Sequence, residues 1–131
     1  MSNVSYIRAG ICCIPFLGHF VAGLTLQIID INIKHLYDKA IRKELPFRDI
    51  SDEVLSLNRQ GRVYTLCLSA ATLSLLVGYF MLEPTLLPRF IGLTLLTLHC
   101  YRVYRYSCNI QALEQFQQKP SRTCIPELHC I

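Results

Sequence analysis

The sequence predicts an all-α membrane protein, built from a two-helix transmembrane hairpin and an additional N-terminal membrane helix. Hydrophobic residues make up 52% of the 131-residue chain and charged residues only 17%, against about 25% charged in an average soluble domain. Residues 64–82 carry no charge, whereas residues 30–62 carry seven of the thirteen Lys and Arg. The charge therefore belongs to the segments that connect the apolar stretches.

The first element expected is a membrane helix within residues 1–30. Ala9–Ile29 contains no charged residue between Arg8 and Asp30, and about 20 apolar residues cross the hydrocarbon of a bilayer. Polar and helix-weakening residues lower the insertion free energy of this stretch. They are Gly10, Pro15, Gly18, His19, Gly23 and Gln27. An interfacial helix and a cleaved signal peptide are the alternatives, although a signal peptide needs a more basic start and a small-residue cleavage site.

Residues 31–62 form a basic amphipathic segment, expected in the cytosol. Apolar residues recur at helical spacing from Ile33 to Leu45, with Lys, Arg and Asp on the other face. Pro46 predicts that this helix ends at Leu45, because the residue before a proline avoids the α region. Ser51 then predicts the N-cap of a new helix, and Gly61 predicts a weak point or bend in it.

The hairpin is expected over residues 63–103, with its turn at 83–89. Val63–Leu82 is charge-free and would be about 30 Å long as a helix, the thickness of the hydrocarbon. Phe90–Tyr101 is only about 18 Å long as a helix, so the second arm spans only if it is counted from Thr85.

Residues 104–131 are expected to form a polar C-terminal helix and tail. Ile110, Leu113 and Phe116 recur every third residue, which predicts further helical turns. Lys119 and Pro120 predict the end of that helix.

Arg and Tyr residues at the basal ends of the two hairpin arms are predicted to anchor the hairpin at the membrane interface. The positive-inside rule assigns these basic ends to the cytosol and the turn to the opposite side. The predicted anchors are Arg59, Arg62, Tyr64, Tyr101, Arg102, Tyr104, Arg105 and Tyr106.

Small residues predict where another helix packs closely against the first arm. Ala70, Ser74 and Gly78 follow at intervals of four, and such a strip permits close approach of helices in membranes. The partner is either the second arm, through Gly92, or a neighbouring copy of the chain.

No catalytic residue, cofactor site or metal site is predicted, and the chain is not expected to be an enzyme. Cys and His occur at positions 99–100 and in the tail as Cys124, His129 and Cys130, without the closed ligand set that zinc requires. The cysteines give no disulfide scaffold, since four of the seven lie in apolar stretches. His19 predicts a helix-packing hydrogen bond, with a proton or ion path as the alternative. Nucleic-acid binding is not expected, because the basic residues mark membrane edges.

The paired apolar arms with a short turn and Arg/Tyr flanks resemble the hydrophobic hairpin of chlamydial inclusion membrane proteins. The opening Ile11-Cys-Cys-Ile-Pro-Phe-Leu-Gly-His19 resembles the openings of other small chlamydial membrane proteins. This resemblance implies type III secretion and insertion into the vacuole (inclusion) membrane, with both hairpin ends facing the host cytosol. A spanning segment at 9–29 departs from that pattern.

The function expected is that of a small, noncatalytic, multi-pass membrane protein that presents cytosolic segments to protein partners. Its other expected partners are the lipid bilayer and further copies of itself. A pore-forming or transport subunit is one alternative, and a soluble helical bundle is another. The residues that would line the pore are Ser69, Thr72, Ser74, Thr94 and Thr97.

Overall fold

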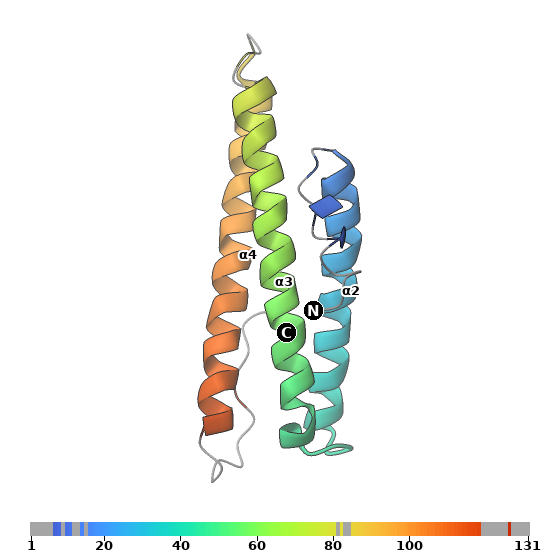
Figure 1. Ribbon diagram of the computed structural model, residues 1–131. Helices are drawn as coiled ribbons and strands as arrows, with labels where there is room; N and C mark the ends of the chain where they lie inside the picture. The colour runs from blue at the N-terminus through green and yellow to red at the C-terminus, as the bar shows by residue number, and fades with distance from the viewer. Residues whose placement is uncertain are drawn as a thin grey trace.

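The computed structural model describes residues 7–8, 10, 11, 14, 16–80, 82, 85–118 and 126, and every regular element within them is helical. The long helices are α2 (Leu17–Ile41), α3 (Phe47–Leu75) and α4 (Leu87–Gln118), and a π-helical segment η1 (Leu76–Phe80) extends α3. Figure 1 shows α3 running antiparallel to both α2 and α4 and packed against both of them. The all-α prediction is confirmed.

The connection between α2 and α3 lies earlier than the sequence predicts. Lys43 adopts a left-handed conformation (φ 58°), while the Lys43 and Glu44 amides donate to the carbonyls of Ala40 and Lys39. This is the Schellman arrangement, which satisfies the last carbonyls of a helix. Helix α2 therefore ends at Ile41 rather than at Leu45.

Helix α3 begins at Phe47, directly after the extended Pro46, and not at an N-cap at Ser51. Ser51 lies inside the helix, where its hydroxyl donates to the carbonyl of Arg48 (2.9 Å). The Phe47 ring lies edge-on to Tyr37 and Phe116, at centroid distances of 6.1 and 5.2 Å. Because this packing needs Phe47 on a fixed helix face, it places the helix start five residues earlier, with Pro46 instead of Ser51 as the N-cap.

The N-terminal membrane helix is shorter than predicted. The continuous helix begins at Leu17, since Phe16 has φ 66°, and the part before Asp30 measures about 20 Å. Residues 9, 12, 13 and 15 of the predicted span lie outside the described residues. In Figure 1, α2 begins well short of the tip of the α3–α4 hairpin.

The predicted segment boundaries at 30/31, 62/63 and 103/104 all fall inside continuous helices. Helix α4 runs from Leu87 to Gln118, so the second hairpin arm and the expected C-terminal helix are one element, and Pro88 and Arg89 belong to its first turn rather than to the turn at 83–89. The boundaries mark changes of composition along a helix, because charge pattern can change without any break in backbone hydrogen bonds.

The half of the molecule formed by residues 31–60 and 107–118, here called the polar half, has an apolar core and a charged exterior. Val54 and Leu113 are fully buried. Further buried side chains come from all three helices: Ile33, Ala40, Phe47, Ile50, Leu55, Ile110 and Phe116. Such a core is what a water-soluble helical bundle requires.

The other half, formed by residues 16–29, 63–80 and 87–101 and here called the apolar half, has an apolar exterior in place of a charged one. Its interior includes Leu26, Ile29, Tyr64 and Leu68. Small and polar residues are buried between its helices: Gly18, Ala22, Thr65, Ala71, Thr72, Gly92 and His99. Large apolar side chains are exposed on α2, α3, η1 and α4: Leu17, Phe20, Leu24, Ile28, Leu66, Leu73, Val77, Leu87, Phe90, Ile91, Leu93 and Leu98. The two halves meet where Asp30, Gly61 and Tyr106 lie together.

Candidate functional site

The contact between Asp30 and α4 joins the two outer helices. Asp30 Oδ1 accepts hydrogen bonds from the Tyr106 hydroxyl (2.6 Å) and from Arg105 Nη2 (3.1 Å). Arg102 lies farther away, with 3.9 Å between its Nη2 and Asp30 Oδ2. Since α2 and α4 have no close backbone contact within the described residues, these side chains hold them in register. We call Asp30, Arg102, Arg105 and Tyr106 the boundary cluster.

Gly61 on α3 allows Tyr106 to reach Asp30. A Cβ atom at position 61 would lie 2.5 Å from Cζ of Tyr106 and 2.7 Å from its Cε1. The Tyr106 ring is almost fully buried, at 1% exposure, so it crosses α3 where no side chain stands in its path. Helix α3 continues without a break through Gly61, and the glycine there allows close packing.

The Tyr106 hydroxyl acts as a donor in this cluster. Burial, followed by the hydrogen bond and charge of Asp30, raises the pKa of the phenol above its ordinary value, and Arg105 and Arg102 oppose that shift. The phenol therefore keeps its proton at physiological pH and donates a hydrogen bond to the Asp30 carboxylate. The guanidinium of Arg105 also lies 4.8 Å from the centroid of the Tyr106 ring, a cation–π distance.

Deeper in the apolar half, polar side chains from all three helices meet. His19 Nε2 of α2 lies 2.8 Å from the Thr72 hydroxyl of α3, and the His19 and His99 rings are 6.5 Å apart between centroids. Thr72 also donates to the carbonyl of Leu68, so His19 Nε2 is the donor to Thr72 when it carries hydrogen. This is the helix-packing hydrogen bond that the sequence predicts for His19.

Replacing Thr72 by valine is expected to lower the free energy of unfolding by about 1–2 kcal/mol, because a buried histidine nitrogen loses its acceptor. Thr72→Ser retains the hydroxyl and is expected to lose less. Unfolding in detergent followed by far-UV circular dichroism measures both. Equal losses for valine and serine would show that the methyl group, and not the hydrogen bond, matters at this position.

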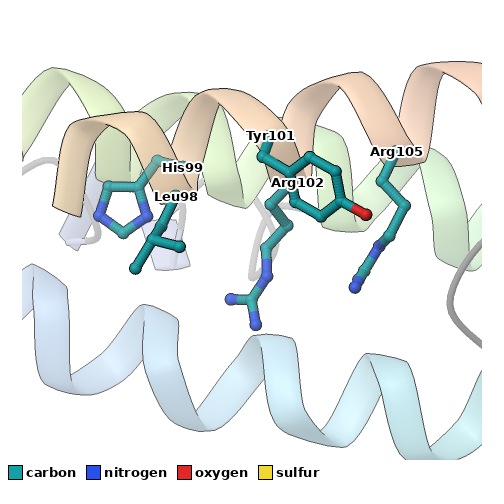
Figure 2. Close-up of a pocket in the computed structure, with 5 residues that line it drawn as sticks. All are labelled: Leu98, His99, Tyr101, Arg102 and Arg105. Atoms are coloured by element: carbon teal, nitrogen blue, oxygen red, sulfur yellow. The ribbon is translucent and has the colours of Figure 1, made fainter. Parts of the chain in front are cut away.

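A cleft of about 290 Å³ lies on the side of α4 that faces α2, and two residues of the boundary cluster line it. Leu98, His99, Tyr101, Arg102 and Arg105 line it. Figure 2 shows His99, Arg102 and Arg105 directed from α4 toward α2, with the Tyr101 ring lying along α4. The cleft exists because α2 packs against α3 and not against α4.

The predicted interface anchors divide into exposed and buried residues. Tyr101 and Tyr104 are exposed, at 57% and 65%, as an interface position requires. Tyr64 and Tyr106 are instead buried in the core. Arg102 and Arg105 face Asp30, Arg59 pairs with Glu114 (2.8 Å), and Arg62 is half-buried.

The predicted packing strip faces away from the rest of the chain. Ala70, Ser74 and Gly78 are exposed, and a Cβ at Gly78 would meet nothing within 4 Å. Gly92 is buried. The strip and Gly92 therefore do not face one another within a single chain. Of the two partners predicted for the strip, a neighbouring copy of the chain is the one that remains.

The predicted pore-lining residues do not share one surface. Thr72 is buried while Ser74, Thr94 and Thr97 are exposed. The hydroxyls of Ser69 and Thr97 donate to carbonyls one turn earlier in their own helices.

Within the described residues no group of three or more His, Cys, Asp or Glu could hold a metal ion. Cys124, His129 and Cys130 lie outside those residues.

Sequence reasoning missed the boundary cluster and the cleft. One signal was available: Asp30 and Arg102 are each the first charged residue after the apolar part of their helix. Helices α2 and α4 run in the same direction on either side of α3, so the two residues that end their apolar parts are expected to lie at one level.

The fold and these contacts define an antiparallel three-helix protein, one half of which exposes apolar side chains. Comparison of the chain with protein-family models, curated proteins and solved structures found no match. Among the described helices, one segment, Phe47–Gly78, is long and apolar enough to cross a membrane.

Proposed function

We propose that this chain is a noncatalytic, multi-pass membrane protein whose apolar half lies in the bilayer and whose polar half is offered to cytosolic protein partners. The observation that carries the proposal is the change of the protein surface from charged to apolar at the boundary cluster. Large exposed apolar side chains surround the apolar half on all three helices, whereas the polar half exposes three large apolar residues, Ile31, Ile41 and Leu45. Lipid is the solvent that favours such a surface.

The burial of the candidate span supports this placement over a soluble bundle. Only 39% of the apolar window within Phe47–Gly78 is buried inside the protein. A core helix of a soluble bundle buries most of its apolar surface, because exposed apolar area costs about 25 cal/mol per Å² in water.

The orientation follows from charge. Seven of the thirteen Lys and Arg lie between positions 30 and 62, mostly on the polar half, and the positive-inside rule assigns that side to the cytosol. Helices α3, with η1, and α4 then form the transmembrane hairpin, and α2 enters the bilayer beside it. The resemblance to chlamydial inclusion membrane proteins extends the proposal to a vacuole membrane.

The chain is expected to remain in the membrane fraction after extraction at alkaline pH, which releases soluble and peripheral proteins. The full-length chain, expressed in bacteria, is assayed by immunoblot of pellet and supernatant. Release of the chain into the supernatant would contradict the proposal and favour the soluble bundle.

A charge on the exposed face of the apolar half is expected to be far more harmful than one on the polar half. Leu73→Arg should cost about 2.5–3.5 kcal/mol of insertion free energy and reduce the alkali-resistant fraction severalfold. Ser56→Arg, also exposed on α3, should be almost neutral. A soluble bundle would tolerate the two substitutions equally.

A further inference from the structure

The cleft between α2 and α4 has no role in the function proposed above. It extends from the last apolar turn of α4 to Arg102 and Arg105 of the boundary cluster, so under the proposed placement it opens where lipid headgroups meet the hydrocarbon. Its lining changes accordingly: Leu98 is 57% exposed and Arg102 and Arg105 follow one and two turns later. Spacings of three and four residues place these side chains on one helix face.

The cleft carries an excess of positive charge. Asp30 supplies one negative charge and Arg102 and Arg105 supply two positive charges. Arg105 is held at 3.1 Å from Asp30 and its side chain is only 14% exposed. Arg102 lies 3.9 Å from Asp30 with 33% of its side chain exposed, which is beyond hydrogen-bond distance. The guanidinium of Arg102 is therefore the cation available to an anion in the cleft.

A buried histidine nitrogen adds a second polar group. His99 lines the same cleft and is about nine-tenths buried, at 9% exposure. Its Nε2 atom is shielded from solvent and has no hydrogen-bond partner among the described residues. A buried polar atom without a partner costs about 1–3 kcal/mol. Because Nε2 is closed to solvent, a bound acceptor would remove that cost once the imidazole ring turns toward the cleft.

We propose that this cleft binds the phosphate group of an anionic membrane lipid, with Arg102 and His99 as donors and Arg105 held in place by Asp30. The inference rests on the proposed membrane placement. Arginine forms paired hydrogen bonds with phosphate oxygens, and basic pockets between membrane helices on the cytoplasmic side bind lipid headgroups. The exposed Leu98 side chain lies where an acyl chain of such a lipid would leave the cleft.

Native mass spectrometry of the full chain in detergent tests the proposal. The probes are phosphatidylglycerol and phosphatidylcholine with identical acyl chains. The wild-type chain is expected to bind phosphatidylglycerol about tenfold more tightly. Arg102→Gln should reduce that affinity about tenfold, whereas Arg59→Gln, which removes the same charge from an exposed pair outside the cleft, should leave it unchanged.

His99→Gln keeps the formal charge and gives a second variant, expected to weaken phosphatidylglycerol binding severalfold. Far-UV circular dichroism in the same detergent shows that each variant is folded. Equal affinities for the two lipids, equal effects of Arg59→Gln and Arg102→Gln, or displacement of the lipid by inorganic phosphate would each overturn the proposal. A chain that resists alkaline extraction yet prefers neither lipid refutes the cleft proposal alone, whereas a chain released by alkali refutes the membrane placement.

Discussion

Replacing Gly61 by alanine is expected to lower the free energy of unfolding by about 2 kcal/mol, although alanine is the better helix former. The new Cβ would lie 2.5 Å from Cζ of Tyr106, inside any allowed contact distance. The buried ring must move, and its hydrogen bond to Asp30 (2.6 Å) lengthens or breaks. Overpacking of a filled core costs about 1–3 kcal/mol, which is more than the stabilisation that the higher helix propensity of alanine provides.

The matched control is Gly78→Ala, at a glycine where a Cβ meets nothing within 4 Å. This variant is expected to be as stable as the wild type or slightly more stable. Equilibrium unfolding in detergent, followed by circular dichroism, compares the two. Equal stabilities of Gly61→Ala and Gly78→Ala would show that Tyr106 does not cross α3 at this glycine.

Replacing Asp30 by alanine is expected to cost about 2–3 kcal/mol. The substitution leaves the Tyr106 hydroxyl and the Arg105 guanidinium without their shared acceptor. Removing one partner of a fully buried ion pair costs about 3–5 kcal/mol. The value expected here is smaller, because the Asp30 side chain is 34% exposed and solvent screens part of the interaction.

Two variants separate charge from hydrogen bonding in this cluster. Asp30→Asn retains Oδ1 as an acceptor and is expected to lose about half as much. Glu114→Ala removes an ion pair of similar length, 2.8 Å to Arg59, from the exposed surface, and should cost less than about 1 kcal/mol. If Asp30→Ala were no more harmful than Glu114→Ala, the boundary cluster would not join α2 to α4.

The helices themselves could be predicted from local pattern. Apolar residues at helical spacing from Ile33 predicted the helical turns that form the second part of α2, and the spacing of Ile110, Leu113 and Phe116 predicted the last turns of α4. Helix ends were less predictable. The end of α2 depends on a left-handed Lys43, and the start of α3 depends on the packing of Phe47 against a helix distant in sequence.

The candidate site was harder to predict because its residues act across helices. Tyr106 was predicted to be an interface anchor like Tyr101 and Tyr104. It lies instead on the same face of α4 as Ile110 and Leu113 and is buried with them. That spacing was a usable signal. The role of Gly61 had no local signal, since it depends on a tyrosine 45 positions later in the chain.

The central claim is that the boundary cluster marks one edge of a membrane and the tip of the hairpin lies beyond the other. Accessibility of single cysteines to an impermeant thiol reagent tests it most directly, in sealed vesicles and in a chain whose own seven cysteines are replaced. Suitable positions are the exposed residues Asp49, Leu86 and Gln118. Phe47 is buried and would give no label in any orientation.

We predict that cysteines at 49 and 118 react from the same side of the membrane and that a cysteine at 86 reacts only from the opposite side. A cysteine at position 3 then reports whether the N-terminal segment also crosses. Reaction of all three cysteines at 49, 86 and 118 from one side of intact vesicles would contradict the transmembrane hairpin.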